Sequence, residues 1–200
     1  HPADSFSVEQ RERYEQMMLE QAQHMQAIVA DLLTLSTLES SPPTEGRPVR
    51  VSLIIQHALE QAKALSNGQH HFVENIDPAL CIVGSENELT SAISNLLTNA
   101  IRYTPKEGTI TVSWYSTEDG GACYSVQDTG IGIAPQDIPR LTERFYRADK
   151  GRSRATGGTG LGLAITRHVA VRHNAELLIQ SQFGTGSVFT LRFAPLRVRT

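Results

Sequence analysis

The chain has 200 residues, of which 40% are hydrophobic and 20% are charged, and its formal net charge is -3. This composition is typical of one globular domain with a small appendage and excludes a disordered or fibrous protein. The slight negative charge argues against nucleic acid as a partner, because nucleic-acid-binding proteins usually carry a basic surface.

The cysteines and the N-terminal sequence bear on the compartment. Cys81 and Cys123 lie in strand-like apolar runs, which favours two free thiols in a reducing compartment over a disulfide. No apolar stretch approaches the ~20 residues that a membrane span needs, and HPADSFSVEQ has no signal-peptide features. Because the chain begins without Met, we expect a fragment, with any membrane anchor outside it.

Residues 7–39 predict one long helix. Ser7 and Gln10 fit a capping box, in which each side chain satisfies a free backbone N–H at the helix start. Apolar residues then recur at alternating steps of three and four, a spacing typical of a coiled-coil seam. The seam consists of Met18, Met25, Ile28, Leu32 and Leu35. One helix cannot bury this stripe, so we expect it to pack against a neighbouring helix and the same pair in a second subunit.

The segment 41–48, SPPTEGRP, is rich in helix breakers and is the expected linker between a helical region at 1–40 and a domain at 49–195. Helices of that domain are predicted at 53–66, with Ser52 as N-cap, at 86–102 and at 160–173. Strands are predicted at 71–76, 81–84, 109–116, 122–128, 175–181 and 187–193. The sum is an α+β fold, a two-layer α/β sandwich with helices on one face of a mixed sheet.

The stretch GGTGLGLAI at 157–165 opens the last predicted helix with glycines. It does not match a P-loop, because the chain contains no Gly-Lys pair, and it lacks the third glycine of a dinucleotide fingerprint. Gly160 and Gly162 nevertheless lie at a first helical turn, where unpaired N–H groups bind anions. Taken alone, the stretch is equally consistent with a flexible loop and tight helix packing.

Polar residues at two other places fit the same chemistry. Asp128 ends a predicted strand and starts DTGIGIAP, so its carboxylate can accept a hydrogen bond from an exocyclic amine such as that of adenine. Asn95 and Asn99 share one helix face, with Arg102 and Tyr103 one turn on. That face offers oxygen ligands for a hard cation, a phosphate-pairing cation and a stacking ring. Alone, the asparagines would more often be ordinary surface residues.

Between the two glycine clusters the chain is basic. From Arg140 to Arg154 it holds six basic residues and two acidic ones. Such a run is often only a solvated face, but glycines at both ends are typical of a lid over a polyphosphate.

Together, these segments resemble the ATP-binding catalytic domain of sensor histidine kinases, within the wider ATPase group that includes gyrase and Hsp90. The similar segments are the asparagine box NLLTNAIRYTP (95–105), the glycine boxes DTGIGIAP (128–135), GGTGLGLAI (157–165) and GTGS (184–187), and the phenylalanine box RFYRAD (144–149). The long helix, which ends DLLTLSTLES, resembles the second helix of the family's dimerisation and phosphotransfer hairpin. Within the family, the amino-acid sequence of these segments is most similar to that of the proteobacterial phosphate-regulon branch.

The resemblance implies ATP and Mg²⁺ as cofactors. Asp128 would bind the adenine amine, and Asn99 would ligate Mg²⁺, with Asn95 as a second candidate ligand. Tyr103 would pack on adenine, and Arg102, Arg147 and Arg152 would reach the phosphates. The full set of nucleotide-binding residues implied is Asn95, Asn99, Arg102, Tyr103, Asp128, Gly130, Gly132, Ile133, Phe145, Tyr146, Arg147, Arg152, Gly158, Thr159, Gly160, Leu161 and Gly162.

The implied activity is transfer of the ATP γ-phosphoryl group to a histidine and then to an aspartate of an OmpR-type response regulator, in phosphate-starvation signalling. The family also implies a homodimer through the hairpin helices and a cytoplasmic location in an inner-membrane protein. The acceptor-histidine box is missing, however, and His24 lies mid-helix without an adjacent acid. We therefore expect no catalytic residue in this chain, which should bind Mg²⁺-ATP without phosphorylating itself.

Other classes of function remain open at this point. One is a non-catalytic ATP-gated interaction module or an ATP-hydrolysing relative of the gyrase and Hsp90 type. Hydrolysing relatives use a glutamate where Asn95 stands, which disfavours hydrolysis. Another is a serine kinase of the anti-sigma type, against which the long helix at 7–39 argues.

Overall fold

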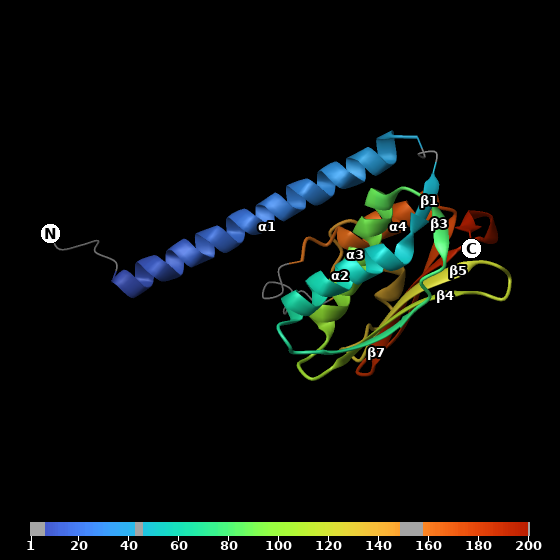
Figure 1. The fold of residues 1–200 in the computed structure, drawn as a ribbon. Coiled ribbons are helices and arrows are strands. Elements are labelled where there is room, and N and C mark those ends of the chain that lie inside the picture. Colours follow the sequence, from blue (N-terminus) through green and yellow to red (C-terminus); the bar gives the residue numbers. More distant parts are fainter. Residues whose placement is uncertain (1–6, 43–45, 149–157, 200) are drawn as a thin grey trace.

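The computed structural model describes residues 7–42, 46–148 and 158–199. Its helices are α1 (Val8–Ser40), α2 (Val51–Ser66), α3 (Glu86–Tyr103) and α4 (Gly162–Arg172) (Figure 1). Its strands are β1 (Arg47–Arg50), β2 (His71–Ile76), β3 (Cys81–Gly84), β4 (Thr109–Ser116), β5 (Ala122–Asp128), β6 (Ala175–Gln182), β7 (Gly186–Phe193) and β8 (Val198–Arg199). Short 3-10 turns are η1 (Ile138–Arg140) and η3 (Pro195–Arg197).

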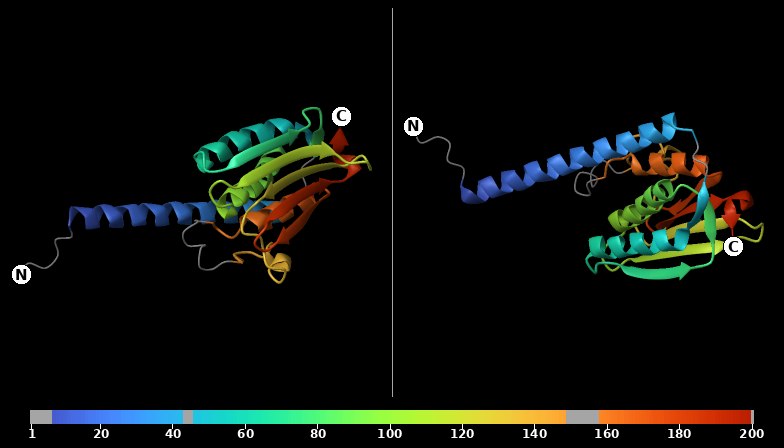
Figure 2. Two further views of the ribbon diagram at one scale, coloured as in Figure 1. Left: turned by 90° about the horizontal axis from the view of Figure 1, so that it is seen from below. Right: turned by 45° about the horizontal axis from the view of Figure 1, so that its top comes forward.

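A mixed five-stranded sheet forms one layer, in the order β2-β4-β5-β7-β6. Strand β2 runs parallel to β4, and the other neighbours are antiparallel. Helices α2, α3 and α4 cover one face of this sheet (Figure 2). A small antiparallel sheet, β1-β3-β8, lies at one end. The predicted α+β architecture, with helices on one face of a mixed sheet, is confirmed.

The core lies between the helices and the sheet. Val112, Val126 and Phe189 form one row across β4, β5 and β7, and all three are buried. Leu89 and Leu96 of α3, in the helical layer, belong to the same core and are fully buried. Burying such a side chain contributes about 1.5–3 kcal/mol. This packing fixes α3 against β5 and so sets the distance between the asparagine face and Asp128.

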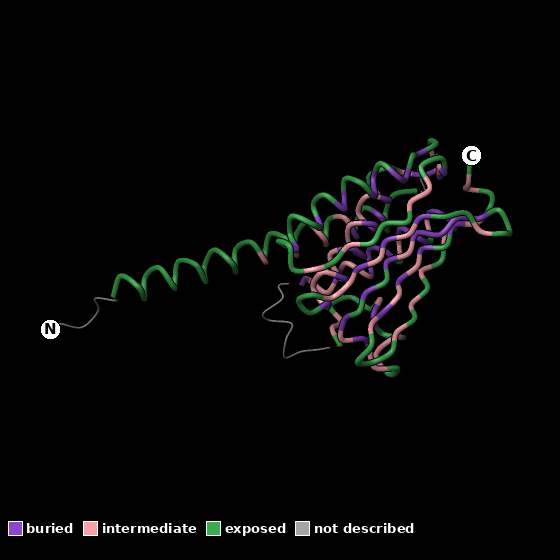
Figure 3. The backbone as a smooth tube through the Cα atoms, turned by 60° about the horizontal axis from the view of Figure 1, so that its bottom comes forward, coloured by how far each residue is buried: buried purple, intermediate pink, exposed green. Residues whose placement is uncertain are grey.

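Helix α1 stands out from the rest of the molecule. It begins with the predicted capping box, since Gln10 N–H donates to the Ser7 hydroxyl and Ser7 N–H to the Gln10 side chain. Residues 8–23 of this helix are exposed throughout (Figure 3). Only its second half contacts the domain, through packing on α4 and burial of Leu35 and Leu38. Part of the predicted seam therefore packs against the chain's own domain.

One local prediction was wrong, and two short strands were missed. Ser52 is not the N-cap of α2, because the helix begins at Val51, with Arg50 as its cap residue. The Ser52 hydroxyl instead donates to the Pro78 carbonyl at 3.4 Å from inside the first turn. Strands β1 and β8 were not predicted, and β1 takes in the last two residues of the expected linker. It forms because β3 offers a free edge to which it pairs. The domain boundaries themselves stay predictions.

The remaining element predictions agree with the structure to within two residues. The strands at 71–76 and 81–84 are confirmed, but they belong to different sheets, so the Asp77-Pro78 turn carries the chain from one sheet to the other. Both cysteines are free thiols, as expected, and Cys123 is buried.

Candidate functional site

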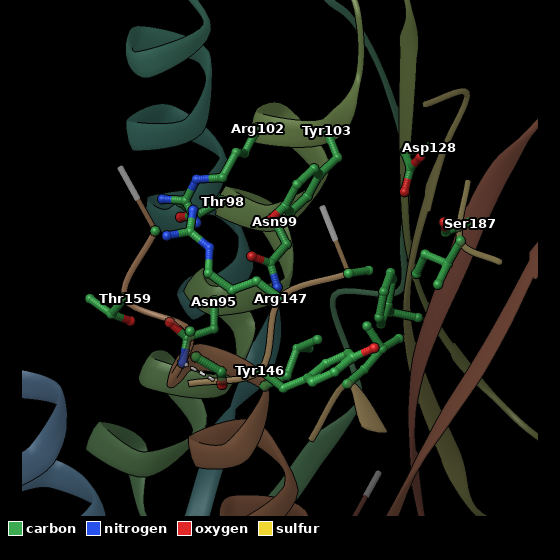
Figure 4. Close-up of a pocket in the computed structure, with 18 of the residues that line it drawn as sticks. Asn95, Thr98, Asn99, Arg102, Tyr103, Asp128, Tyr146, Arg147, Thr159 and Ser187 are labelled. Carbon is green, nitrogen blue, oxygen red and sulfur yellow. Dashed lines mark hydrogen bonds between the residues drawn. The ribbon is translucent and has the colours of Figure 1, made fainter. Parts of the chain in front are cut away.

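A pocket lies between the asparagine face of α3, the end of β5 and the start of α4 (Figure 4). All but four of the residues predicted for nucleotide binding line it. They are Asn95, Asn99, Arg102, Tyr103, Asp128, Gly132, Ile133, Tyr146, Arg147, Gly158, Thr159, Gly160 and Gly162.

Three of the other four lie outside the pocket, and the fourth is not described. Gly130 is behind the wall, where its N–H donates to Asp128 Oδ1 at 2.8 Å. Leu161 is fully buried beneath the pocket as the cap residue of α4. Phe145 is 55% exposed and does not line the cavity. Arg152 lies outside the described residues.

The pocket also contains residues that the sequence did not single out. These are Ala27, Asp31, Thr98, Ile131, Leu141, Ala148, Leu163, Ser187 and Phe189. Thr98 could have been found, because it is one turn from Asn95 and Arg102 on α3. Ala27 and Asp31 come from α1, and no local pattern indicated that this helix reaches the pocket.

Asp128 marks one end of the pocket, which we call the carboxylate end. It lies at the last position of β5, opposite Ser187 of β7, and is 6% exposed. Burial raises the pKa of its carboxyl group, while hydrogen bonds from the backbone of Gly130 and Ser187 lower it. Apolar residues such as Ile133 and Phe189 line the wall nearby. A buried carboxylate beside apolar walls can select a flat ring that carries an amino group.

The opposite end, which we call the cationic end, consists of Arg102, Arg147 and the start of α4. Both guanidinium groups lie close to Gly158, and a side chain there would displace Arg102, since its Cβ would come within 2.7 Å of Nη1. The pKa of Arg102 is lowered, and burial is the largest cause. The next largest effect is that of Tyr103, which raises this pKa, and Arg147 then lowers it further. Two cations this close favour an anion between them.

The start of α4 completes the cationic end. Leu161 N–H donates to the Thr159 hydroxyl at 3.2 Å, and Asn95 Nδ2 donates to the Gly162 carbonyl at 3.1 Å. Gly160 has φ +75°, and its carbonyl accepts from Phe145 N–H at 2.9 Å. A side chain at Gly160 would meet the Phe145 backbone at 2.9 Å. Glycine is thus needed at position 160, where the backbone packs against that of Phe145. This position lies beside helical N–H groups that attract anions.

One aromatic wall of the pocket is held in place by surface groups. The Tyr146 hydroxyl donates to Asp137 Oδ1 at 2.6 Å, and the Arg140 guanidinium lies 4.2 Å from the ring centroid. Arg140 in turn pairs with Glu143 at 3.1 Å. Hydrogen bonding to Asp137 raises the pKa of Tyr146. The same hydrogen bond and the Arg140 contact hold the ring in the pocket wall.

The side chains fit a cation that is held jointly with a ligand. Among the described residues, no group of three or more His, Cys, Asp or Glu could hold a metal ion. Asn95 and Asn99 place hard amide oxygens in the pocket. Because Asn95 donates its amide nitrogen to Gly162, its oxygen is the atom left for a cation. Mg²⁺ is typically bound by one or two side chains together with phosphate oxygens.

The described histidines do not form part of this pocket. His173 is buried, and its Nδ1 donates to the Val169 carbonyl at 2.8 Å while Nε2 accepts from Ser85 N–H at 3.0 Å. His24 Nδ1 is buried without a hydrogen-bond partner among the described residues, and His24 does not line the cavity. The structure therefore brings no described histidine into the pocket.

Comparisons with known proteins agree with this geometry. Residues 84–197 match the family model for histidine kinase-, DNA gyrase B- and HSP90-like ATPases. The chain is 50% identical over 185 residues to the phosphate regulon sensor protein PhoR of Pseudomonas aeruginosa, covering 92% of this chain and 42% of that protein. It is 39% identical over 183 residues to the sensor-like histidine kinase SenX3 of Mycolicibacterium smegmatis, covering 90% of this chain and 47% of that protein.

A solved structure extends the likeness to three dimensions. The mycobacterial sensor histidine kinase MprB matches with a TM-score of 0.67 and 28% identity, covering 74% of this chain and 97% of that chain. The chain spans less than half the length of both curated relatives. Within the described ranges, none of the helices has the length and hydropathy to cross a membrane.

Proposed function

The chain belongs to the family of histidine kinase-, DNA gyrase B- and HSP90-like ATPases, and we propose that it is the ATP-binding catalytic region of a sensor histidine kinase. In this proposal it binds Mg²⁺-ATP and supplies the γ-phosphoryl group to a histidine on a segment outside this chain. The phosphoryl group then passes to an aspartate of a response regulator.

The observation that carries the proposal is the polarity of one pocket. A buried carboxylate, Asp128, lies at one end, and two guanidinium groups and a helix start lie at the other. ATP has the matching polarity, because its adenine carries an exocyclic amine and its triphosphate is strongly anionic. The Tyr103 ring lines the pocket between these ends and offers a surface for adenine (Figure 4).

The Mg²⁺ ion would be held by Asn99, with Asn95 beside it, and would neutralise charge on the phosphates when bound. The chain's own residues bind and orient the nucleotide. In the transfer, a histidine nitrogen forms a bond to the γ-phosphorus while the bond to the bridging oxygen breaks and ADP leaves. Arg102 and Arg147 offset the negative charge on the phosphates, so positioning and electrostatics supply most of the catalysis.

The finer assignments rest on the relatives. The 50% identity with a phosphate regulon sensor protein supports phosphate-starvation signalling. The partner that we propose is an OmpR-type response regulator. We propose that α1 is the second hairpin helix of a homodimer, which accounts for its exposed apolar residues such as Met18 and Met25. A membrane anchor outside this chain would place it on the cytoplasmic side of an inner membrane.

Hydrolysis of ATP is disfavoured by the chemistry of Asn95. An amide has no basic atom at neutral pH, and this one donates its nitrogen to the Gly162 carbonyl. Steady release of phosphate from ATP by this chain would favour the gyrase-like alternative.

Calorimetric titration with Mg²⁺-ATP tests the binding proposal. We expect the original chain to bind ATP saturably. We expect at least tenfold weaker binding to Asp128→Asn, because an uncharged amide in this buried site pairs imperfectly with the adenine amine. Asp119→Asn, on the exposed β4–β5 turn, is the matched control and should bind ATP like the original chain. Equal affinities for all three chains would contradict the assignment of Asp128.

Incubation with γ-labelled ATP tests whether the histidine that accepts the phosphoryl group lies outside this chain. We expect no label on this chain. Label that is stable in base, labile in acid and lost in His24→Ala would instead make His24 the acceptor.

A further inference from the structure

Helix α1 brings a carboxylate to the cationic end of the pocket. Ala27 and Asp31, one helical turn apart, both line the cavity. Asp31 Oδ2 accepts a hydrogen bond from the Thr159 hydroxyl at 2.6 Å, although the two residues are 128 positions apart in the sequence. Figure 4 shows Thr159 beside the blue ribbon of α1. This acid lies outside the segment that matches the ATPase family.

The surroundings of Asp31 are those of an anion site. Its partner Thr159 also accepts from Leu161 N–H at 3.2 Å, so the hydroxyl links the carboxylate to the start of α4. The N-terminal end of a helix attracts negative charge. The charge of Asp31 also raises the pKa of Arg102, against the larger lowering by burial. Asp31 therefore interacts with the two sources of positive charge that a bound phosphate would use.

Contacts further along α1 hold Asp31 in this position. Glu39 pairs with Arg144 and lies 3.3 Å from His168 Nε2. Arg172 donates to the Leu38 carbonyl at 3.1 Å, and Leu38 itself is buried. The carboxylate is thus presented by a docked helix, and its distance from the cationic end is set by the docking of α1.

We propose that Asp31 is an internal anion that competes with the phosphates of the nucleotide for the cationic end. The inference rests on the proposed function, since it presupposes a nucleotide in the pocket. With α1 docked, the carboxylate repels the phosphates and engages the Thr159 hydroxyl. Because the coupling of two binding equilibria is reciprocal, docked α1 weakens ATP binding by the same factor by which ATP weakens the docking of α1. The position of α1 would in this way set the affinity for ATP.

The substitution Asp31→Asn separates charge from shape. Asparagine has nearly the same size and still offers an oxygen to the Thr159 hydroxyl, but it carries no charge. Affinities for ATP, ADP and adenosine are measured by calorimetry with the full chain at low salt. We expect a gain of about tenfold for ATP, which equals about 1.4 kcal/mol, about threefold for ADP and none for adenosine, because the repulsion grows with phosphate charge. The gain should shrink at high salt.

Glu15→Gln provides the control. It removes one negative charge from the exposed half of α1, away from the pocket, and should leave all three affinities unchanged. Hydrogen exchange of α1 gives a second readout. ATP, but not adenosine, should speed exchange over residues 27–38 in the original chain, and this effect should be smaller in Asp31→Asn.

Three outcomes would overturn the competition. The first is an unchanged affinity for ATP in Asp31→Asn, and the second is an equal gain for ATP and adenosine, which would indicate a structural effect. The third is weaker ATP binding that depends on Mg²⁺, which would make Asp31 a metal ligand. A different result, in which neither the folded original chain nor the variant binds any of the three ligands, would overturn the proposed function itself.

Discussion

Arg172 fastens helix α1 to the rest of the molecule, and its replacement tests how strongly α1 is held. Its guanidinium donates to both oxygens of Glu88 at 2.8–3.1 Å and to the carbonyls of Leu38 and Ser41 at 3.1 and 2.7 Å. The last turn of α1 contains no basic residue of its own. Because carbonyls at a helix end lack helical partners, Arg172 supplies from α4 the cation that α1 lacks.

The substitution Arg172→Met removes this cation and keeps most of the apolar stem. The side chains of Arg172 and Glu88 are 9% and 16% exposed, so the pair is largely desolvated. Removing one partner of a fully buried pair costs about 3–5 kcal/mol, and we expect about 2–3 kcal/mol here because Glu88 keeps some contact with water. For a chain of 200 residues, this loss corresponds to a fall in Tm of about 4–12 °C.

Urea unfolding followed by circular dichroism measures the loss. Arg167→Met is the matched control on the same helix, because its guanidinium is exposed and its hydrogen bond within the described residues is a long one, to the Thr142 hydroxyl at 3.4 Å. The double variant Arg172→Met/Glu88→Gln should recover part of the stability, since it leaves no unpaired charge. A loss in Arg172→Met no larger than in Arg167→Met would refute the reasoning, as would a double variant less stable than Arg172→Met.

Three further predictions concern pH, backbone conformation and packing. Burial is the largest influence on His173 and lowers its pKa below the usual 6.5. The contribution of neutral His173 to the free energy of unfolding should therefore be complete above about pH 6.5 and should be lost as the pH falls towards the folded pKa. The loss arises because a proton on Nε2 would oppose Ser85 N–H. His173→Gln should flatten this pH profile, measured by urea unfolding. Gly160→Ala, at φ +75°, should cost about 1–2 kcal/mol in urea unfolding and weaken ATP binding. Leu35→Ala should cost about 2–4 kcal/mol, whereas exposed Leu33→Ala should change unfolding by less than about 0.5 kcal/mol.

The predictable parts of the site are those in which local geometry decides. Asn95, Asn99 and Arg102 could be placed on one face because the apolar residues of α3 fix which face is buried. Asp128 could be placed at a strand end because the alternation of β5 runs up to it. Helical and strand periods are properties of short segments, so the sequence determines them without knowledge of the fold.

The parts that escaped prediction depend on distant partners. Ser52 has the side chain of an N-cap but lies inside α2, where its hydroxyl donates to the Pro78 carbonyl 26 positions away. Strand β1 exists because β3 provides an edge for it. Asp31 lies in a run that predicts only a polar helix face, and its role depends on where α4 begins. None of these contacts leaves a periodic trace in the segment concerned.

The apolar stripe of α1 illustrates the same limit and suggests a division of labour. Its spacing predicts one continuous seam, yet Met18 and Met25 are 71% and 66% exposed, whereas Leu35 and Leu38 are buried against the domain. A continuous stripe can therefore serve two partners, the protein's own domain at one end and, as we propose, a second subunit at the other. If so, Leu35→Ala should weaken the docking of α1 and tighten ATP binding through release of Asp31, while substitutions at Met18 should affect self-association alone. Sedimentation velocity combined with ATP titration would distinguish the two, and an effect of Met18→Ala on ATP affinity would contradict the division.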